Sequence, residues 1–187
     1  GTGCRKGEAL ALSWDDLLGN DQARIAHNLA RVNGQIIIKA PKTKASLRTI
    51  DILPPADQGL ELASALQAAD RAASRHWSNP RNLIFTTESG EPIDPRNALR
   101  DFETVTDKAG VPEGPLHSLR HTFATLLLES GADIEAVSRQ LGHARTSITM
   151  DVYRHIRDSD RSRELHKHAG ALTEKASKAA RLRVVGE

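Results

Sequence analysis

Apolar residues recur at helical spacing over much of this 187-residue chain. Near the N-terminus, Leu10, Trp14 and Leu17 stand four and three residues apart, which predicts one or two amphipathic helical turns. After Pro54-Pro55, a longer helix is predicted to run to about Trp77. The apolar stripe of this second helix consists of Leu62, Leu66 and Ala69.

The period of the pattern changes to two between residues 25 and 53, which predicts β-strands. Residues 25–32 alternate in character, and Ile36–Ile38 is β-branched. Asn33-Gly34 between these runs favours a tight two-residue hairpin turn, because both positions of that turn need a positive φ. A third alternating run at residues 48–53 follows a lysine-rich connection, PKTKAS. The pattern predicts a three-stranded antiparallel sheet of these consecutive strands.

Three further helices are indicated by capping residues or by apolar spacing. Asp94-Pro95, an N-cap followed by a first-turn proline, predicts a helix that ends at Gly110. Asp133 predicts the start of another helix, which ends at Gly142. Between them, residues 116–129 are predicted to be helical. The residues expected to anchor this helix to the core are Leu119, Phe123, Leu126 and Leu127. The predicted fold class is therefore mostly α, an α+β fold with one small sheet.

The composition indicates which class of protein this is, but it says little about the function. Apolar residues make up 39% and charged residues 27%, as in globular domains, and no apolar run is long enough to cross a membrane. A single cysteine excludes an intramolecular disulfide and fits a reducing cytoplasm. The net charge of +2 does not by itself indicate nucleic acid. Basic residues nevertheless gather locally, in PKTKASLRT, HIRDSDRSRELHKH and EKASKAARLR.

Eight polar residues stand where a purely structural pattern does not need them. They are Arg5, Glu8, Lys42, Lys44, His117, Arg120, His143 and Tyr153. Taken singly, each has an ordinary explanation, such as a surface charge, a solvated turn or a half-buried tyrosine. Taken together, the cations and histidines suit a phosphate, above all one that gains negative charge in a five-coordinate transition state. Tyr153, the only tyrosine, is a candidate nucleophile whose phenolate form neighbouring cations would favour.

Four segments carry a resemblance to a known family. They are TGCRKGEALALSWDDL, PKTKASLRTI, LHSLRHTFATLLLESGADIEAVSRQLGH and SITMDVYRH. In this order they resemble the boxes of the tyrosine recombinase (phage integrase) family, from the first residues to about His155. The series HSLRHTFAT, LGH and Tyr153 is a specific signal, because four roles recur in order with the expected spacing. The resemblance implies the helical catalytic domain of the DNA breaking-rejoining type.

The resemblance also implies a role for each of the eight polar residues. The implied roles are catalytic arginines for Arg5 and Arg120, an orienting acid for Glu8, the two site histidines for His117 and His143, the nucleophile for Tyr153 and the hairpin lysine for Lys42. Lys44 is a rival for the lysine role, since the loop length leaves the alignment open by two residues.

The implied chemistry is transesterification without a metal or any other cofactor. Tyr153 would attack a phosphorus of the DNA backbone and form a 3′-phosphotyrosyl link, while the 5′-hydroxyl leaves, protonated by Lys42. His117 would act as general acid and base for the tyrosyl oxygen. Attack by the 5′-hydroxyl of a second strand would reverse the step and complete site-specific recombination or integration. Arginines, the lysine and helix N–H groups would supply the charge that a metal ion supplies elsewhere.

The family also sets expectations for domains and partners. Residues 1–158 would be the catalytic domain, and residues 159–187 a helical tail that could contact a neighbouring protomer. The core-binding domain and the helix that precede this region in the family are expected to be absent, so the chain is interpreted as a fragment. Double-stranded DNA would be the partner, with a tetramer assembled on it by the full-length protein and no membrane involved. The expected location is the cytoplasm, at the nucleoid, in a bacterial or phage setting.

Two other interpretations use the same residues. A type IB topoisomerase shares the chemistry but replaces strand exchange by rotation, and the sequence boxes fit it less well. A catalytically silent DNA-binding module of the same fold would not need Tyr153. A metal centre is not predicted, because the histidines and the single cysteine show no ligand spacing.

Overall fold

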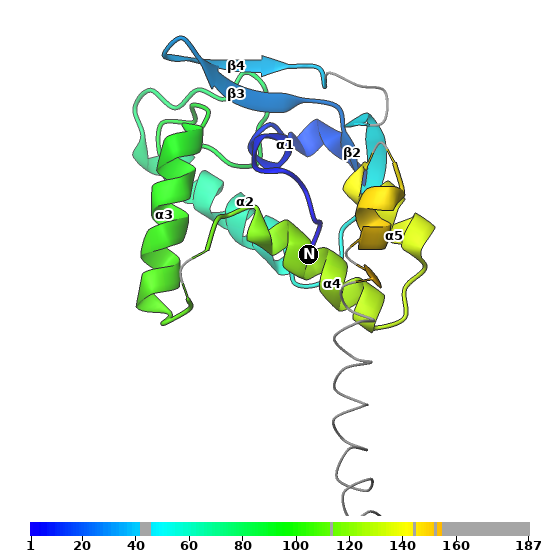
Figure 1. Ribbon diagram of the computed structural model, residues 1–187. Helices are drawn as coiled ribbons and strands as arrows, with labels where there is room; N and C mark the ends of the chain where they lie inside the picture. The colour runs from blue at the N-terminus through cyan, green and yellow to red at the C-terminus, as the bar shows by residue number, and fades with distance from the viewer. Residues whose placement is uncertain (42–45, 113, 144, 152, 155–187) are drawn as a thin grey trace, which may run out of the picture.

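The computed structural model of the protein describes residues 1–41, 46–112, 114–143, 145–151 and 153–154 (Figure 1). The helices are α1 (Lys6–Leu10), α2 (Ala56–Ala73), α3 (Pro95–Lys108), α4 (Ser118–Glu129) and α5 (Ile134–Leu141), with a 3₁₀ turn, η1, at Trp14–Asp16. The strands are β1 (Leu17–Gly19), β2 (Gln22–Ile25), β3 (Asn28–Val32), β4 (Gln35–Lys39) and β5 (Arg48–Asp51). The chain is helical again at residues 147–151 and 153–154. The predicted class, mostly α in an α+β fold with antiparallel strands, is confirmed.

Some predictions concern residues beyond this description. Lys42, Lys44 and the predicted tail at residues 159–187 lie outside the described residues. Within the described part of the chain, no helix has both the length and the apolar character needed to cross a membrane.

The strands form two sheets instead of the predicted one. β3 and β4 pair as a separate hairpin, and its turn at Asn33-Gly34 has the two positive φ angles that were predicted, 49° and 83°. In the other sheet, β2 lies between β1 and β5. The prediction of three consecutive strands in one sheet is therefore wrong, because β5 pairs with β2 and not with β4.

The predicted strand at residues 25–32 is divided because its inward residues belong to two different cores. Ile25 packs with Ile50 and the other buried residues of the three-stranded sheet. Leu29 packs instead with Leu10 and Ala11 at the end of α1. The alternation of the sequence continues across residues 26 and 27, but the chain changes sheets there, which only the packing decides.

Helix α2 turns a different face to the core than its leucine spacing predicts. Leu62 and Leu66 are 61% and 56% exposed, whereas Ala63 is buried. On the inner face, the Gln67 side-chain amide donates to the main-chain carbonyls of residues 83 and 84, at 2.7 and 2.9 Å. This extended segment has buried carbonyls to satisfy, so the inner face of α2 needs a hydrogen-bond donor more than a leucine.

The buried face of α4 also differs from the prediction. Of the predicted anchors, Leu119 and Leu126 are 53% and 59% exposed, so this part of the prediction is wrong. The buried line of α4 runs instead through Arg120, Ala124 and Leu128, at i, i+4 and i+8. Arg120 is thus an inward residue on the packing face of the helix, where the sequence pattern predicts a separate polar face. The apolar core shared by α4 and α5 consists of Ala124, Leu128, Val137 and Leu141.

The predicted caps of α3 and α5 are confirmed. The Asp94 side chain accepts a hydrogen bond from the N–H of Arg96 at 2.9 Å, and Asp133 accepts one from the N–H of Ala136 at 2.9 Å. Gly142 follows α5 in the left-handed region, with φ 67° and ψ 46°. Asp133 and Gly142 thus fix where α5 begins and ends. The end of α5 lies beside the N-terminal segment and the start of α4 (Figure 1).

Candidate active site

Three parts of the chain that are distant in sequence meet at the start of α1, the start of α4 and the end of α5. Arg120, in the first turn of α4, donates from Nη1 to the carbonyl of Gly3 at 2.8 Å and from Nη2 to that of Leu141 at 2.5 Å. Arg5, which precedes α1, donates from Nη2 to the carbonyl of Gly142 at 3.3 Å. The two predicted arginines are therefore held on neighbouring carbonyls at the end of α5.

Arg120 is charged and almost fully buried, with 5% of its surface exposed. Burial and then the positive charge of Arg5 lower the pKa of Arg120 to about 10, which leaves it charged at neutral pH. Two of the five N–H groups of its guanidinium bond to the carbonyls named above. The others can serve an anion, and a phosphate would relieve the repulsion between the two arginines.

Glu8 is the counter-charge of this site and is 3% exposed. Its carboxylate accepts the backbone N–H of Arg5 at 2.9 Å and Nη1 of Arg5 at 2.8 Å. Arg48 adds Nη1 at 3.2 Å and Nη2 at 2.9 Å. Burial alone would raise the pKa of Glu8, but the hydrogen bonds from Arg48 and Arg5 outweigh it, so the pKa is lowered. Glu8 is thus ionised and shared by two arginines.

Arg48 was not singled out from the sequence. It occupies the same face of its strand as Ile50 and Ile52, which are both buried. An arginine at an inward position of an alternating strand is the signal that could have identified it. Its neighbour in space is Gly142: a Cβ added there would lie 2.8 Å from Cδ of Arg48, so the close approach needs a glycine.

His143 follows Gly142 and faces a buried partner. Its Nδ1 lies 2.9 Å from Oγ1 of Thr149, a fully buried residue. Burial, and then the charges of Arg120 and Arg5, lower the pKa of His143 to about 4. The ring is therefore neutral at pH 7. Nothing in the sequence pattern distinguishes Thr149, which is found only from the structure.

His117 immediately precedes α4 and is exposed. Its ring is 5.1 Å from that of His121, edge to face. Although the residue as a whole is exposed, partial burial of the ring and then the charges of His121 and Arg120 lower its pKa, which favours the neutral imidazole, a proton acceptor, at neutral pH. His117 and Arg120 line the same hollow of about 700 Å³ between α1, α3 and α4.

Tyr153 is half-buried and packs against the apolar core of α4 and α5. Leu141 of that core supplies one of the carbonyls that bind Arg120. The Tyr153 hydroxyl makes no hydrogen bond to the described residues. The structure therefore brings Arg5, Glu8, His117, Arg120 and His143 together, and it places Tyr153 on the adjoining core without a hydrogen bond to them.

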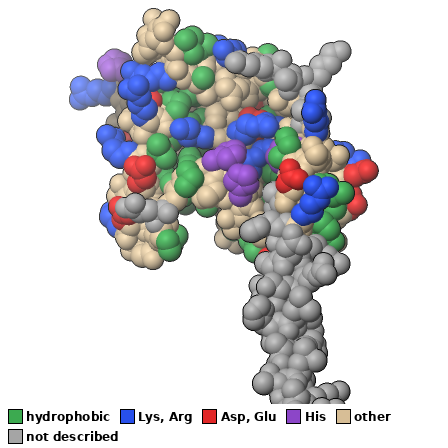
Figure 2. Space-filling model, in the orientation of Figure 1, with side chains coloured by type: hydrophobic (Ala, Val, Ile, Leu, Met, Phe, Trp, Pro, Cys, Tyr) green, Lys and Arg blue, Asp and Glu red, His purple; other side chains and the backbone are tan. Residues whose placement is uncertain are grey.

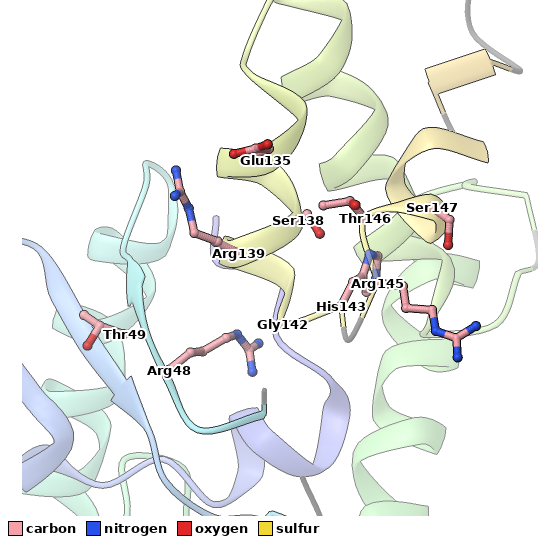
Figure 3. Close-up of a pocket in the computed structure, with 10 residues that line it drawn as sticks. All are labelled: Arg48, Thr49, Glu135, Ser138, Arg139, Gly142, His143, Arg145, Thr146 and Ser147. Carbon is pink, nitrogen blue, oxygen red and sulfur yellow. The ribbon is translucent and has the colours of Figure 1, made fainter. Parts of the chain in front are cut away.

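The outer side of the site is an open hollow of about 830 Å³ between β5, α5 and residues 145–147. In Figure 3, Arg48 reaches from β5 toward Gly142, with His143 and Arg145 beyond it. Figure 2, in the orientation of Figure 1, shows lysine and arginine side chains around a group of histidines near the middle of the face turned to the viewer. Among the described residues, no group of three or more His, Cys, Asp or Glu side chains could hold a metal ion. The guanidiniums of Arg5 and Arg120, which meet at the end of α5, suit an anion.

The lowered pKa of His143 predicts a pH dependence of stability. Because the folded pKa of about 4 lies below the ordinary 6.5, the unfolded chain binds more protons between these values, and stability falls as the pH drops from 6.5 to 4. Since the ring is partly solvated, we expect this group to contribute on the order of 1 kcal/mol. The free energy of unfolding, measured in urea at several pH values, should fall less steeply between pH 6.5 and pH 4 for His143→Gln than for the wild type. Parallel curves would contradict the prediction.

Comparison with known proteins gives consistent matches. The sequence profile of the phage integrase family matches residues 1–160. A tyrosine recombinase XerC-like protein of Caldanaerobacter subterraneus subsp. tengcongensis is 34% identical over 169 residues, covering 83% of this chain and 43% of that protein. A tyrosine recombinase XerC of Mycobacterium sp. (strain KMS) is 36% identical over 169 residues, covering 90% of this chain and 50% of that protein.

A solved structure of the Tn1549 transposon integrase in complex with transposon right end DNA is similar in fold. The two sequences are 26% identical, and the TM-score is 0.67. The matched region covers 90% of this chain and 56% of the integrase chain. The chain spans about half the length of the curated relatives it matches, 43% and 50% for the two named above.

Proposed function

Because the chain belongs to the phage integrase family, we propose that it forms the catalytic part of a site-specific DNA recombinase. Residues 1–158 would be the catalytic domain of that enzyme. The observation that supports this most strongly is the meeting of Arg5 and Arg120, from opposite parts of the chain, at the end of α5 beside His143. Two charged guanidiniums with N–H groups to spare, next to a neutral histidine, suit a phosphodiester.

In the proposed reaction, the two arginines hold the non-bridging oxygens of the scissile phosphate and stabilise the charge that they gain in the transition state. His143 would help from the other side. If the Thr149 hydroxyl donates to Nδ1, the proton of the neutral ring is on Nε2, which can donate to the phosphate. The low pKa of His143 thus suits a hydrogen-bond donor that is not itself a proton carrier at neutral pH.

Tyr153 is proposed to supply the nucleophile. Its oxygen forms a bond to phosphorus as the bond from phosphorus to the 5′-oxygen breaks, and the phenol proton passes to the neutral ring of His117. Lys42 or Lys44 would give a proton to the leaving 5′-oxygen. The product is a 3′-phosphotyrosyl link, which a 5′-hydroxyl of another strand can reopen. The step requires Tyr153 to approach the phosphate held by Arg5 and Arg120.

Double-stranded DNA is the proposed substrate, and four copies of the full-length protein would assemble on two duplexes. The Tn1549 transposon integrase, which has a similar structure, was solved in complex with DNA. Residues 159–187 are proposed to serve contacts between protomers. A topoisomerase of type IB and a silent binding module remain the competing functions, and covalent chemistry and strand exchange separate them.

The proposal is tested by covalent trapping on DNA. A pool of duplexes with a randomised segment and a nick would be incubated with the chain, because a short cleaved strand diffuses away and prevents religation. The wild type should form a complex that resists detergent, and sequencing of the trapped pool would identify the preferred duplex. Tyr153→Phe should lower the trapped fraction by at least about 10³-fold, since the nucleophilic oxygen is lost.

The same duplex provides the controls for this experiment. Tyr153→Phe should still shift the duplex in a gel with an affinity close to that of the wild type, because the phenyl ring keeps its packing on α4 and α5. Retardation of the wild type without any trapped complex would instead support the binding module. Trapping with relaxation of supercoiled plasmid but no exchange between two duplexes would support the topoisomerase.

A further inference from the structure

We propose that Arg48 is a positioning residue of this site: it holds Glu8 and, through it, Arg5 on one side, and the end of α5 with His143 on the other. The proposal rests on the proposed function for its catalytic meaning. Its structural content stands on the contacts of Arg48 alone and can be tested without DNA.

The first contact of Arg48 is a two-pronged ion pair with Glu8. Nη2 lies 2.9 Å from Oε2 and Nη1 lies 3.2 Å from Oε1, so the guanidinium faces both carboxylate oxygens. The two side chains are 7% and 3% exposed, so the pair is shielded from water. A planar fork of this kind fixes the carboxylate in orientation as well as in distance, which a lysine does not do.

The fixed carboxylate in turn sets Arg5. The same two oxygens accept the backbone N–H of Arg5 at 2.9 Å and its Nη1 at 2.8 Å. Arg5 is itself 38% exposed in its side chain, and apart from Glu8 its guanidinium bonds among the described residues to the carbonyl of Gly142. Glu8 is therefore the link through which a buried arginine on β5 determines where a solvent-facing arginine points.

The second contact of Arg48 is with the end of α5. Its Nε donates to the carbonyl of Gln140 at 2.9 Å, and its side chain fills the space that a Cβ on Gly142 would need. The Gln140 side chain strengthens this junction, because it pairs with the N–H and the carbonyl of Asp51 on β5, at 2.9 and 2.8 Å. The turn that presents His143 is thus attached to β5.

Both contacts converge on the carbonyl of Gly142, which accepts the hydrogen bond from Nη2 of Arg5. Arg48 therefore holds the donor, through Glu8, and the acceptor, through α5, of the contact that joins Arg5 to the turn before His143. Arg48 lines the inner edge of the outer hollow, but its side chain is 7% exposed and its guanidinium is bonded to Glu8 and Gln140. It is therefore proposed to act on the reaction through these groups and not by touching DNA.

The test compares Arg48→Lys with Arg24→Lys in the same chain. Lysine keeps the positive charge but loses the fork, so Glu8 and Gln140 can no longer be held together. With the trapped duplex at saturating concentration, the cleavage rate of Arg48→Lys should fall by about 10²-fold, as expected for a small displacement of reacting groups. The DNA dissociation constant should change by less than about threefold, because the substituted side chain is buried and keeps its charge.

A double-mutant cycle shows whether Arg48 acts through Glu8. The combined variant Glu8→Gln with Arg48→Lys should cleave no more slowly than the slower single variant, since both changes release the same group. Losses that simply multiply would overturn the proposal.

The control for the comparison with Arg48→Lys is an exposed arginine. Arg24, on β2, has a side chain that is 53% exposed and pairs with Asp16 at 3.5 Å, so Arg24→Lys should leave cleavage unchanged.

A second measurement needs no DNA. The pKa of the His143 imidazole, followed by NMR and assigned with His143→Gln, should rise from about 4 toward 6.5 in Arg48→Lys, because the turn no longer holds the ring buried and beside Arg120 and Arg5. An unchanged titration, a wild-type cleavage rate or an unfolded variant would each overturn the positioning role. If the wild type itself fails to cleave DNA, the proposed function fails, and the titration still decides the role of Arg48.

Discussion

Arg120→Lys is expected to slow covalent DNA cleavage by about 10²–10³-fold, the loss typical of removing one strong donor to a developing negative charge. The guanidinium of Arg120 bridges the carbonyls of Gly3 and Leu141 and still has N–H groups for a phosphate. A single ammonium keeps the charge, but it cannot reach both carbonyls and the phosphate at once. The loss should therefore come from geometry at constant charge.

The measurement is the single-turnover rate of covalent trapping at saturating duplex, with circular dichroism to show that the variant is folded. Arg100→Lys is a matched control, because Arg100 is an exposed arginine on α3, and it should cleave like the wild type. If Arg120→Lys cleaves within about threefold of the wild type, the paired donors of Arg120 are not needed in the transition state, and the proposed role of this residue is wrong.

Glu8→Gln is expected to destabilise the fold by about 3–5 kcal/mol, the usual consequence of removing one partner from a buried ion pair. Glutamine has nearly the same shape, but it carries no charge, and its NH₂ group would face the N–H donors of Arg5 or Arg48. Since Arg48 is 7% exposed in its side chain, its charge would remain buried without a counter-charge. A loss of this size is a large part of the total stability of a domain.

The effect of Glu8→Gln should depend on pH in a defined direction. Because the folded pKa of Glu8 is lowered, its contribution is fully present above the ordinary carboxyl value of 4.5 and is lost as the pH falls through the folded pKa. Denaturant unfolding should show wild type and variant far apart at pH 7 and closer at pH 3. Glu61→Gln, an exposed change on α2, should cost less than about 0.5 kcal/mol at either pH. Equal stability of Glu8→Gln and the wild type at pH 7 would contradict the importance of the shared carboxylate.

Local chemistry was predictable wherever a few neighbouring residues decide the backbone. Asp94 and Asp133 cap α3 and α5 as predicted, because the side chain of an N-cap needs only the N–H groups of the next turn. Asn33-Gly34 makes its turn for the same reason: both residues tolerate a positive φ. The predicted apolar stripe of α2 and the predicted anchors of α4 were wrong, because which face of a helix is buried depends on what packs against it.

The candidate site residues divide in the same way. Arg5, Glu8, His117, Arg120 and His143 were singled out from the sequence, and the structure brings them together. Arg48, Gln140 and Thr149 were missed. Each contacts the candidate site through a hydrogen bond to a residue far away in the sequence or on another element, so residue type and spacing alone do not identify them.

The amino-acid sequence by itself determined the N-caps of α3 and α5, the hairpin turn, the mostly helical class and the family, because each depends on residues close together or on their order along the chain. It did not determine where α2 ends, at Ala73 instead of the predicted Trp77. The tertiary structure alone decided which strands pair, which face of each helix is buried and that Arg48 joins Glu8 to the end of α5. Strand pairing, helix faces and the contacts of Arg48 depend on burial of side chains against partners distant in the chain, and the free energy of that burial cannot be inferred from the spacing of neighbouring residues.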